Sequence, residues 1–512
     1  MNISNLLFGD NLMRYLVDEV DIASHSLTLN LIHKLCRILK KEGINYCHWK
    51  SNAALDRSAS GENDLDLLIA RDHIQRFTEI LCRLNFKEAR FQPDKELPGV
   101  LNYYGYDEDS EKLVHVHAHY QLILGDDTTK NYRLPIEKAY LASTVQGELF
   151  KVPSPEFELI VLIIRMMLKH SSWDAVLSFH ADLSSTERHE ITYLTEQVDW
   201  FHLNVILKRD LPFLDVALFD SCLDSLQPGS SLLSRYKIGR QLHQLLQAHA
   251  RRSTLTDTFL KIWRRSVWGI RRYVFKRPKR KYFANGGAII ALVGGDGSGK
   301  STAVNELYRW LSRNFVTTKV HLGKPRWSLS TYLVKGLLRI GRRLGLFSNK
   351  KVLVESSSNT PSIHPPSYPW LLWHVFTARD RYRAYVQARR FSTNGGLVIC
   401  DRFPLPQIKC MDGAQTGRLI ETDKLNPLRN FLITREEKFY QQILPPDLLI
   451  VMKVDPEIAV QRRADEDANW IRNRSLEIWE LDWQDTPVHI IDAGQPMAEM
   501  LASLKSLVWR NL

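Results

Sequence analysis

The chain has 512 residues, more than one hydrophobic core usually organises, so its length predicts two to four domains. Its formal net charge of +12 favours anionic partners such as nucleotides, nucleic acid or acidic membrane surfaces. The start of the chain lacks the pattern of a signal peptide, and the most apolar run, residues 159–168, is too short to span a bilayer. The six cysteines have no CxxC spacing, which is typical of reduced residues in a cytoplasmic protein.

Near the N-terminus, residues 64–69 alternate acidic and apolar side chains and therefore predict a strand. This segment follows a predicted strand at 46–50 and a polar turn, and it leads into a predicted helix at 72–84. Because successive side chains of a strand point to opposite faces, Asp64 and Asp66 share one face. Two carboxylates placed in this way can hold Mg²⁺ for nucleotidyl transfer, and they also occur on ordinary solvated strands.

The segment from about residue 31 to residue 124 resembles the nucleotidyltransferase superfamily, in which a turn of small residues precedes Asp-x-Asp on a strand. The resemblance implies an α+β nucleotidyltransferase-like domain over residues 1–150. It also implies a Mg²⁺ site at Asp64 and Asp66.

Two features depart from that resemblance. Lys50 and Ser51 replace the family's Gly-Ser turn, and His115 stands on the predicted strand where the third carboxylate is expected. An active enzyme and an inactive nucleotide- or sugar-binding domain therefore both remain open. On the same strand His115, His117 and His119 share a face, where they could bind Zn²⁺ or Ni²⁺ or serve as ordinary polar groups.

Residues 151–260 show helical spacing of Leu, Ile and Trp, most clearly over 156–169, 184–205 and 232–249. No catalytic constellation stands out in this sequence. We therefore expect a helical middle region, or an extension of the first domain.

A basic and aromatic linker, residues 261–285, comes next. Its segment 262–281 can form a solvated helix whose tryptophans pack on the middle region. It can also form a peripheral contact with an anionic membrane, such as the inner membrane surface. A contact with nucleic-acid phosphates is the least favoured interpretation. Pro278 and a glycine turn at 285–287 mark the end of the linker.

The apolar run at 288–293 predicts a buried parallel strand, and a helix begins after the glycines that follow it. Gly294, Gly299, Lys300 and Ser301 fit the GxxxxGK[ST] pattern in this strand–loop–helix setting. The amides of such a loop surround a polyphosphate, the lysine reaches its β- and γ-phosphates, and the serine hydroxyl holds Mg²⁺. The predicted ATP-binding residues are Gly294, Gly295, Gly297, Ser298, Gly299, Lys300, Ser301 and Thr302.

The loop Gly-Asp-Gly-Ser-Gly-Lys-Ser-Thr resembles that of thymidylate kinases and related nucleoside monophosphate kinases, and the resemblance extends over residues 286–512. It includes segments 376–381, 395–403, 446–457 and 489–493. The resemblance implies an α/β kinase domain, with helices on both faces of a parallel sheet, that uses ATP and Mg²⁺.

The resemblance also implies roles for residues outside the loop. Asp401 would hold Mg²⁺ together with Ser301. Arg402 and Arg381 would clamp the phosphate of an acceptor, and Asp296 would contact its sugar. Arginines after a later strand would form a lid over the transferred phosphoryl group, and one of them should matter most. The catalytic candidates are Lys300, Arg402, Arg462, Arg463, Arg472 and Arg474.

Two features argue against thymidylate itself as the acceptor. Residues 404–415 replace the segment with which thymidylate kinases read the pyrimidine, and residues 324–369 form an insertion that those enzymes usually lack. The fused N-terminal domain points the same way. The predicted function is an ATP-dependent kinase that acts on a nucleoside monophosphate or a sugar- or glycan-type acceptor.

Other functions remain open at the level of the sequence. The N-terminal domain could be a nucleotidyltransferase that uses Asp64 and Asp66, with the P-loop domain as a nucleotide sensor. The chain could also be a non-enzymatic scaffold on a membrane surface or on nucleic acid. The family resemblance is compatible with a dimer, and the sequence does not define the oligomeric state.

Overall fold

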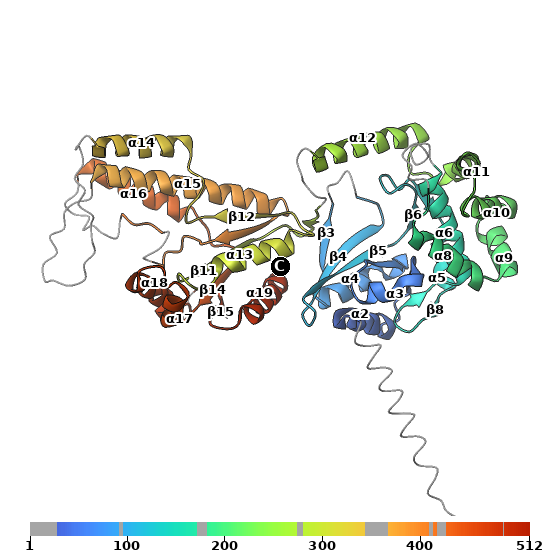
Figure 1. Ribbon diagram of the computed structural model, residues 1–512, viewed down its shortest axis with the longest axis horizontal. Coiled ribbons are helices and arrows are strands. Elements are labelled where there is room, and N and C mark those ends of the chain that lie inside the picture. Colours follow the sequence, from blue (N-terminus) through green and yellow to red (C-terminus); the bar gives the residue numbers. More distant parts are fainter. Residues whose placement is uncertain are drawn as a thin grey trace, which may run out of the picture. The chain divides into compact units, whose positions relative to one another are not determined.

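The computed structural model describes residues 28–91, 96–171, 182–273, 280–343, 367–408, 413–416, 426–484 and 486–512. Contacts between residues divide the chain into two compact units, Met1–Lys279 and Arg280–Leu512. Each unit has helices packed on a β-sheet (Figure 1). Within the described ranges, no helix combines the length and the apolarity that crossing a membrane requires.

The N-terminal unit contains a sheet in which neighbouring strands follow the order β1-β2-β5-β4-β3. Strands β2 and β5 run parallel, and the other neighbours are antiparallel. The parallel register sets Asp66 opposite His117. The strands of the unit are β1 Tyr46–His48, β2 Leu65–Ile69, β3 Lys87–Arg90, β4 Val100–Asp107, β5 Lys112–His119, β6 Leu122–Leu124, β7 Tyr132–Leu134, β8 Val145–Gln146 and β9 Lys151–Val152.

Helices cover both faces of this sheet. On one face, α2 (Asn30–Lys41) and α4 (Ile74–Arg83) share a core with Leu67. On the other face, α6 (Pro155–His170) shares a core with Leu68. Because adjacent residues of a strand point to opposite faces, the apolar run in β2 allows a helical layer on each side. Two short helices, α3 Leu55–Ala59 and α5 Glu137–Ala142, complete this part.

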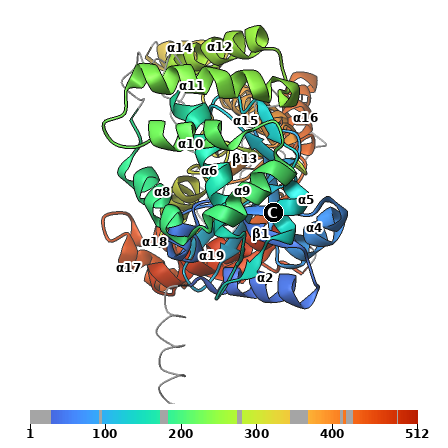
Figure 2. The ribbon, with the colours of Figure 1, turned by 90° about the vertical axis from the view of Figure 1, so that its right-hand side faces the viewer.

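Helix α6 is buried around its whole circumference, and the middle helices contact it (Figure 2). The segment 184–205, predicted as one helix, forms two, because the chain is extended at Val198 and Asp199. The Asp199 side chain caps the second helix by accepting hydrogen bonds from its first amides. The middle helices are α8 Ser185–Gln197, α9 Trp200–Asp210, α10 Val216–Ser225 and α11 Leu232–Leu245.

A single helix, α12 (Thr254–Tyr273), covers the first part of the predicted linker, whereas residues 274–279 lie outside the described ranges. A basic side of this helix docks on a loop of the same unit, where Arg265 pairs with Asp126 at 2.8 Å. The Trp263 side chain is 59% exposed. The helix therefore turns this tryptophan toward solvent and not onto the middle region.

The C-terminal unit contains a sheet of order β12-β13-β11-β14-β15, in which all neighbouring strands are parallel. This parallel sheet confirms the predicted α/β class. Its strands are β11 Ile289–Gly294, β12 Thr317–His321, β13 Leu397–Asp401, β14 Leu448–Lys453 and β15 His489–Asp492, and a short strand, β10 Tyr282–Phe283, precedes them.

Both faces of this sheet are buried, as the apolar strand sequences require. Ile289 and Ala291 of β11 pack with Tyr385 on one face, whereas Ile290 and Leu292 are equally buried on the other. The helices of the unit are α13 Lys300–Leu311, α14 Leu329–Arg343, α15 Tyr368–Thr393, α16 Pro427–Gln441, α17 Pro456–Arg462, α18 Ala468–Glu480 and α19 Met497–Asn511.

Candidate active site

The predicted phosphate-binding loop lies at the carboxyl end of β11, the central strand of the parallel sheet. Gly297 and Gly299 have φ angles of 82° and 76°, a left-handed conformation that is unfavourable for residues with a Cβ atom. A Cβ atom on Gly297 would also lie 2.7 Å from the carbonyl oxygen of Ala459. Helix α13 begins directly after the loop, at Lys300, so its first amides are available to an anion there.

Lys300 is buried and folds back over the loop. Its Nζ donates to the carbonyl oxygen of Gly295 at 2.5 Å and lies 3.4 Å from Ser298 Oγ. Burial lowers the pKa of Lys300 to about 8, although the neighbouring Asp296 carboxylate opposes this shift. The ammonium group is therefore held inside the loop, where a charged phosphate oxygen would be a stronger partner than a carbonyl oxygen.

Two oxygen donors that can hold a divalent cation meet beside the loop. Ser301 lies in the first turn of α13, and Asp401 ends the neighbouring strand β13. Ser301 Oγ and Asp401 Oδ2 are 3.4 Å apart. A hydroxyl and a carboxylate suit Mg²⁺, which prefers oxygen ligands and usually keeps several waters. Parallel pairing of β13 with β11 brings the two predicted ligands together.

Asp296, inside the loop, pairs with two arginines that come from later parts of the chain. Arg402 Nη2 lies 3.2 Å from its Oδ1, and Arg474 Nη1 lies 2.9 Å from its Oδ2. Arg402 directly follows β13 and has a left-handed φ of 65°, whereas Arg474 lies on α18. Among the described residues, the buried Nε of Arg474 has no hydrogen-bond partner. This guanidinium therefore retains a donor for an anionic group.

The other predicted lid arginines have different partners. Arg463 and Arg472 form ion pairs with neighbouring glutamates at 2.7 and 2.6 Å. Arg462 donates to a backbone carbonyl at 2.8 Å. Of the four candidates, Arg474 is therefore the one whose side chain bonds to a residue of the loop.

Arg381, predicted to bind the acceptor phosphate, contacts the backbone that follows β12. Its Nε donates to the carbonyl oxygen of Leu322 at 3.1 Å, and its Nη2 donates to that of Gly323 at 2.9 Å. Its Nη1 contacts the Tyr440 hydroxyl. In this arrangement the guanidinium supports the chain at the carboxyl end of β12.

A buried network that sequence reasoning missed joins the predicted insertion to α15. Asp380 accepts hydrogen bonds from the Ser328 amide at 2.9 Å and from Thr331 Oγ1 at 2.6 Å. Arg379 donates to Ser330 Oγ. The network holds the first turn of α14. The hydroxyl residues at the start of this helix, Ser328, Ser330 and Thr331, were the available signal, because such residues favour helix starts.

A cavity of about 880 Å³ lies beside β12 and α15. His321 in its lining stands opposite Asp401 in the strand register, so the cavity begins one strand away from the predicted Mg²⁺ ligand. Its charge suits an anionic molecule. The basic residues of the lining are Lys319, Lys324, Arg326 and Arg383.

The segment predicted to replace the pyrimidine-reading part is described in pieces. Residues 413–416 are held by the buried Glu436, which accepts hydrogen bonds from the amides of Gln415 and Thr416 at 3.2 and 3.1 Å. Residues 409–412 and 417–425, and residues 344–366 of the insertion, lie outside the described ranges.

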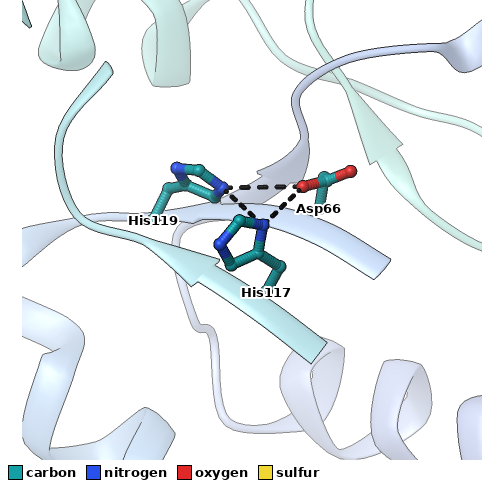
Figure 3. A group of neighbouring side chains, drawn as sticks. All are labelled: Asp66, His117 and His119. Carbon is teal, nitrogen blue, oxygen red and sulfur yellow. Dashed lines mark hydrogen bonds and ion pairs between the residues drawn. The ribbon is translucent and has the colours of Figure 1, made fainter. Parts of the chain in front are cut away.

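In the N-terminal unit, Asp66 meets two histidines of the adjacent strand (Figure 3). Its Oδ1 lies 3.0 Å from His117 Nδ1 and 3.5 Å from His119 Nε2. Lys50 Nζ lies 2.9 Å from the same oxygen. Burial raises the pKa of Asp66, but the Lys50 charge and the histidine hydrogen bonds outweigh it and hold this pKa well below its usual range. Burial lowers the pKa of His119 to about 3, which keeps its imidazole neutral.

The carboxylates predicted to share Mg²⁺ have separate partners. Asp64 Oδ1 lies 2.7 Å from His115 Nδ1, whereas Asp66 belongs to the cluster with His117 and His119. The partners of both carboxylates are nitrogen atoms. They belong to the histidine side chains and to the ammonium group of Lys50. This donor set does not fit a Mg²⁺ pair, which prefers oxygen ligands.

The turn after β1 is held by two buried acids, Glu158 of α6 and Glu190 of α8. Glu190 accepts a hydrogen bond from the Ser51 amide at 2.9 Å, and Glu158 accepts one from the Asn52 amide at 3.2 Å. Burial raises the pKa of Glu158 to about 7. Ser51 belongs to the turn that replaces the Gly-Ser turn of nucleotidyltransferases, and Asn52 follows it. The backbone amides of both residues are therefore already bonded within the protein.

The parallel sheet, the glycine loop after its central strand and Lys300 at the following helix define a P-loop, kinase-like domain. The chain is similar to the uncharacterized ATP-binding protein YghR of Escherichia coli strain K12, with 28% identity over 228 residues, 43% of this chain and 86% of the relative. It is also similar to the uncharacterized ATP-binding protein YghS of that strain, with 28% identity over 227 residues, 43% of this chain and 92% of the relative. A thymidylate kinase of Legionella pneumophila strain Corby is 25% identical over 232 residues, 43% of this chain and 94% of the relative. No family model matches the chain.

Proposed function

We propose that the C-terminal unit is an ATP- and Mg²⁺-dependent phosphotransferase. The observation that carries this proposal is the grouping of Lys300, Arg402 and Arg474 around Asp296, beside the Ser301–Asp401 pair. Phosphoryl transfer depends mainly on positioning and on stabilisation of negative charge, which such a group of cations can supply. The names of the relatives, two ATP-binding proteins and a thymidylate kinase, agree with the proposal.

In this proposal each group has a defined task. Lys300 and the loop amides bind the phosphates of ATP, and Ser301 and Asp401 hold Mg²⁺, which neutralises phosphate charge. Arg402 and Arg474 exchange Asp296 for phosphate oxygens, since a doubly charged phosphate competes well with one carboxylate. Helix α18, which carries Arg474, then acts as the lid.

We propose an anionic acceptor, either a nucleoside monophosphate or a phosphorylated sugar- or glycan-type molecule. The support is the basic lining of the cavity beside β12, whose residue His321 is in register with Asp401. None of the described residues 404–408 and 413–415, which stand where thymidylate kinases read the pyrimidine, lines this cavity. Its residues therefore favour an acceptor that is recognised through its charge.

The rival function, nucleotidyl transfer at Asp64 and Asp66, has less support. Asp64 is paired with His115, and the amides of Ser51 and Asn52 are occupied by buried glutamates. A turn that binds phosphate needs unoccupied amides. The Ser51 and Asn52 amides are therefore not available to a triphosphate in this arrangement.

The test is ATP consumption by the full chain with a panel of nucleoside monophosphates and sugar phosphates, with products identified by mass spectrometry. We expect ADP and a phosphorylated acceptor from the wild type and no turnover from Lys300→Ala. Lys438→Ala, an exposed lysine on α16, serves as the matched control and should retain activity. Pyrophosphate and a nucleotidylated product, lost in Asp66→Asn and kept in Lys300→Ala, would transfer the chemistry to the N-terminal unit.

A further inference from the structure

The cluster of Asp66, His117 and His119 lies in the N-terminal unit, outside the residues proposed to transfer phosphoryl groups (Figure 3). We propose that these three side chains bind one divalent transition-metal ion of the Zn²⁺ class. The proposed kinase uses residues of the other unit.

The geometry of the three atoms fits a shared metal ion. Asp66 Oδ1, His117 Nδ1 and His119 Nε2 form a triangle with edges of 3.0, 3.3 and 3.5 Å. Neighbouring ligands of a tetrahedral ion with bonds of about 2.1 Å are about 3.4 Å apart. The separations between these three atoms therefore match those between ligands of a tetrahedral ion.

The fold holds these atoms in place. Asp66 and His117 are directly opposed in the parallel register of β2 and β5, and His119 lies two residues further along the same face. The side chains of His119 and Asp66 are 6% and 14% exposed, whereas that of His117 is 24% exposed. The site is thus buried at its base, and His117 leaves it reachable from solvent.

The donor atoms select the kind of ion. Two imidazole nitrogens and one carboxylate oxygen suit Zn²⁺ and related ions, whereas Mg²⁺ prefers oxygen ligands alone. Three protein ligands are the number that catalytic zinc sites use, with water or substrate in the fourth position. The cluster therefore differs in ligand type and metal class from the Mg²⁺ pair that the sequence suggested.

Lys50 competes with the metal in this proposal. Its ammonium group lies 2.9 Å from the Asp66 oxygen that would bind the ion. A positive charge at this distance lowers the affinity for a cation. Replacing Lys50 with an uncharged side chain of similar length should therefore strengthen metal binding.

The experiment uses the full chain, free of any affinity tag and stripped of metal with a chelator. Zn²⁺ is added, and its dissociation constant is measured by competition with a chromogenic chelator. The bound amount is determined by elemental analysis after dialysis. We expect one Zn²⁺ per chain, not displaced by millimolar Mg²⁺, and a Co²⁺ derivative with an absorption spectrum typical of nitrogen ligation.

Variants separate this site from other histidines. Asp66→Asn and His117→Gln should each weaken Zn²⁺ binding by about 100-fold, since each removes one of three ligands. His115→Gln, on the same strand face but paired with Asp64, should retain wild-type affinity. Lys50→Met should bind about tenfold more tightly or better.

Circular dichroism and thermal unfolding establish which variants are folded. If His117→Gln does not fold, Asp66→Asn and Lys50→Met still provide opposite expected shifts. Failure of the folded wild type to retain Zn²⁺ at micromolar concentration would overturn the proposal and leave a hydrogen-bonded polar cluster. Zn²⁺ binding that Asp66→Asn and Lys50→Met leave unchanged would also overturn it, because the ion would then lie elsewhere.

Discussion

Arg474 Nη1 lies 2.9 Å from Asp296 Oδ2, an ion pair that joins α18 to the phosphate-binding loop across 178 positions of the chain. The same carboxylate holds Arg402 on its other oxygen. In the predicted phosphate-binding loop, a carboxylate between two guanidinium groups pairs with cations to which phosphate oxygens could bind instead. This ion pair distinguishes Arg474 from the other three predicted lid arginines, which look equivalent in the sequence.

Arg474→Gln should lower the turnover of the proposed kinase by about 100-fold or more, because it removes a cation that stabilises charge in the transition state. Arg472→Gln is the matched control, since Arg472 lies on the same helix and pairs with the exposed Glu457. We expect this control to remain within about twofold of the wild type. Steady-state kinetics with saturating ATP checks both variants, and equal losses in the two would remove the special role of Arg474.

ATP binding should weaken above pH 8. In the folded chain, burial lowers the pKa of Lys300 to about 8, so the ammonium group proposed to bind phosphate loses its proton as the pH rises through this value. Above that pH, Lys300 must take up a proton from solution when ATP binds. From pH 7 to pH 9 the dissociation constant should rise by about tenfold.

Calorimetry in buffers of different ionisation enthalpy checks this prediction, because it measures the proton taken up with ATP. Lys300→Met supplies the control: its weaker binding should show no such slope between pH 7 and pH 9. A flat profile in the wild type would mean that another group provides the charge for the phosphates.

Asp401→Asn should raise the Mg²⁺ concentration needed for half-maximal activity and lower turnover by about 100-fold, since a carboxylate ligand becomes a neutral amide. Asp465→Asn serves as the control, because Asp465 is an exposed acid between α17 and α18. Activity is measured as a function of free Mg²⁺ at fixed ATP. An unchanged Mg²⁺ requirement in Asp401→Asn would contradict the assignment of this ligand.

Helix α12 should bind anionic membranes through its exposed apolar face. Leu255, Phe259, Ile262 and Trp263, spaced as one helical face, are 85%, 67%, 63% and 59% exposed. The formal net charge of +12 on the chain would favour acidic lipids. Sedimentation of the full chain with phosphatidylserine vesicles should exceed that with neutral vesicles and decrease with salt.

The double variant Phe259→Ser with Trp263→Ser should lose this sedimentation. Phe201→Ser removes an aromatic residue that is 79% exposed on another helix, α9, and should sediment as the wild type does. If the wild type stays in the supernatant at low salt, α12 does not bind these vesicles.

The sequence predicted the parts of the fold whose signals are local. The strand β11, the glycines with left-handed φ angles and the helix after Lys300 are contiguous, so their periodicity and spacing could be recognised directly. The break between α8 and α9 was missed, although Asp199 is a common helix-capping residue, because apolar residues continue on both sides of it.

The hydrogen-bond and ion-pair partners of individual side chains could not be predicted in the same way. Four arginines near the predicted lid look equivalent in sequence, and the packing of α18 on the loop distinguishes Arg474. Arg381 matches the motif expected of an acceptor clamp, yet its guanidinium bonds to the backbone of Leu322 and Gly323. The contacts that decide these roles lie far apart along the chain and leave no periodic signal.

The glycine-rich loop and the α/β class of the C-terminal unit could be predicted from the sequence alone, because their signals come from residues that are adjacent along the chain. Which carboxylate contacts which basic side chain depends on the tertiary structure. Pairing of β2 with β5 joins Asp66 to His117 and His119, and it leaves Asp64 to His115. Strand register and helix packing determine these contacts, since they bring together side chains that are far apart in the sequence and share no local pattern.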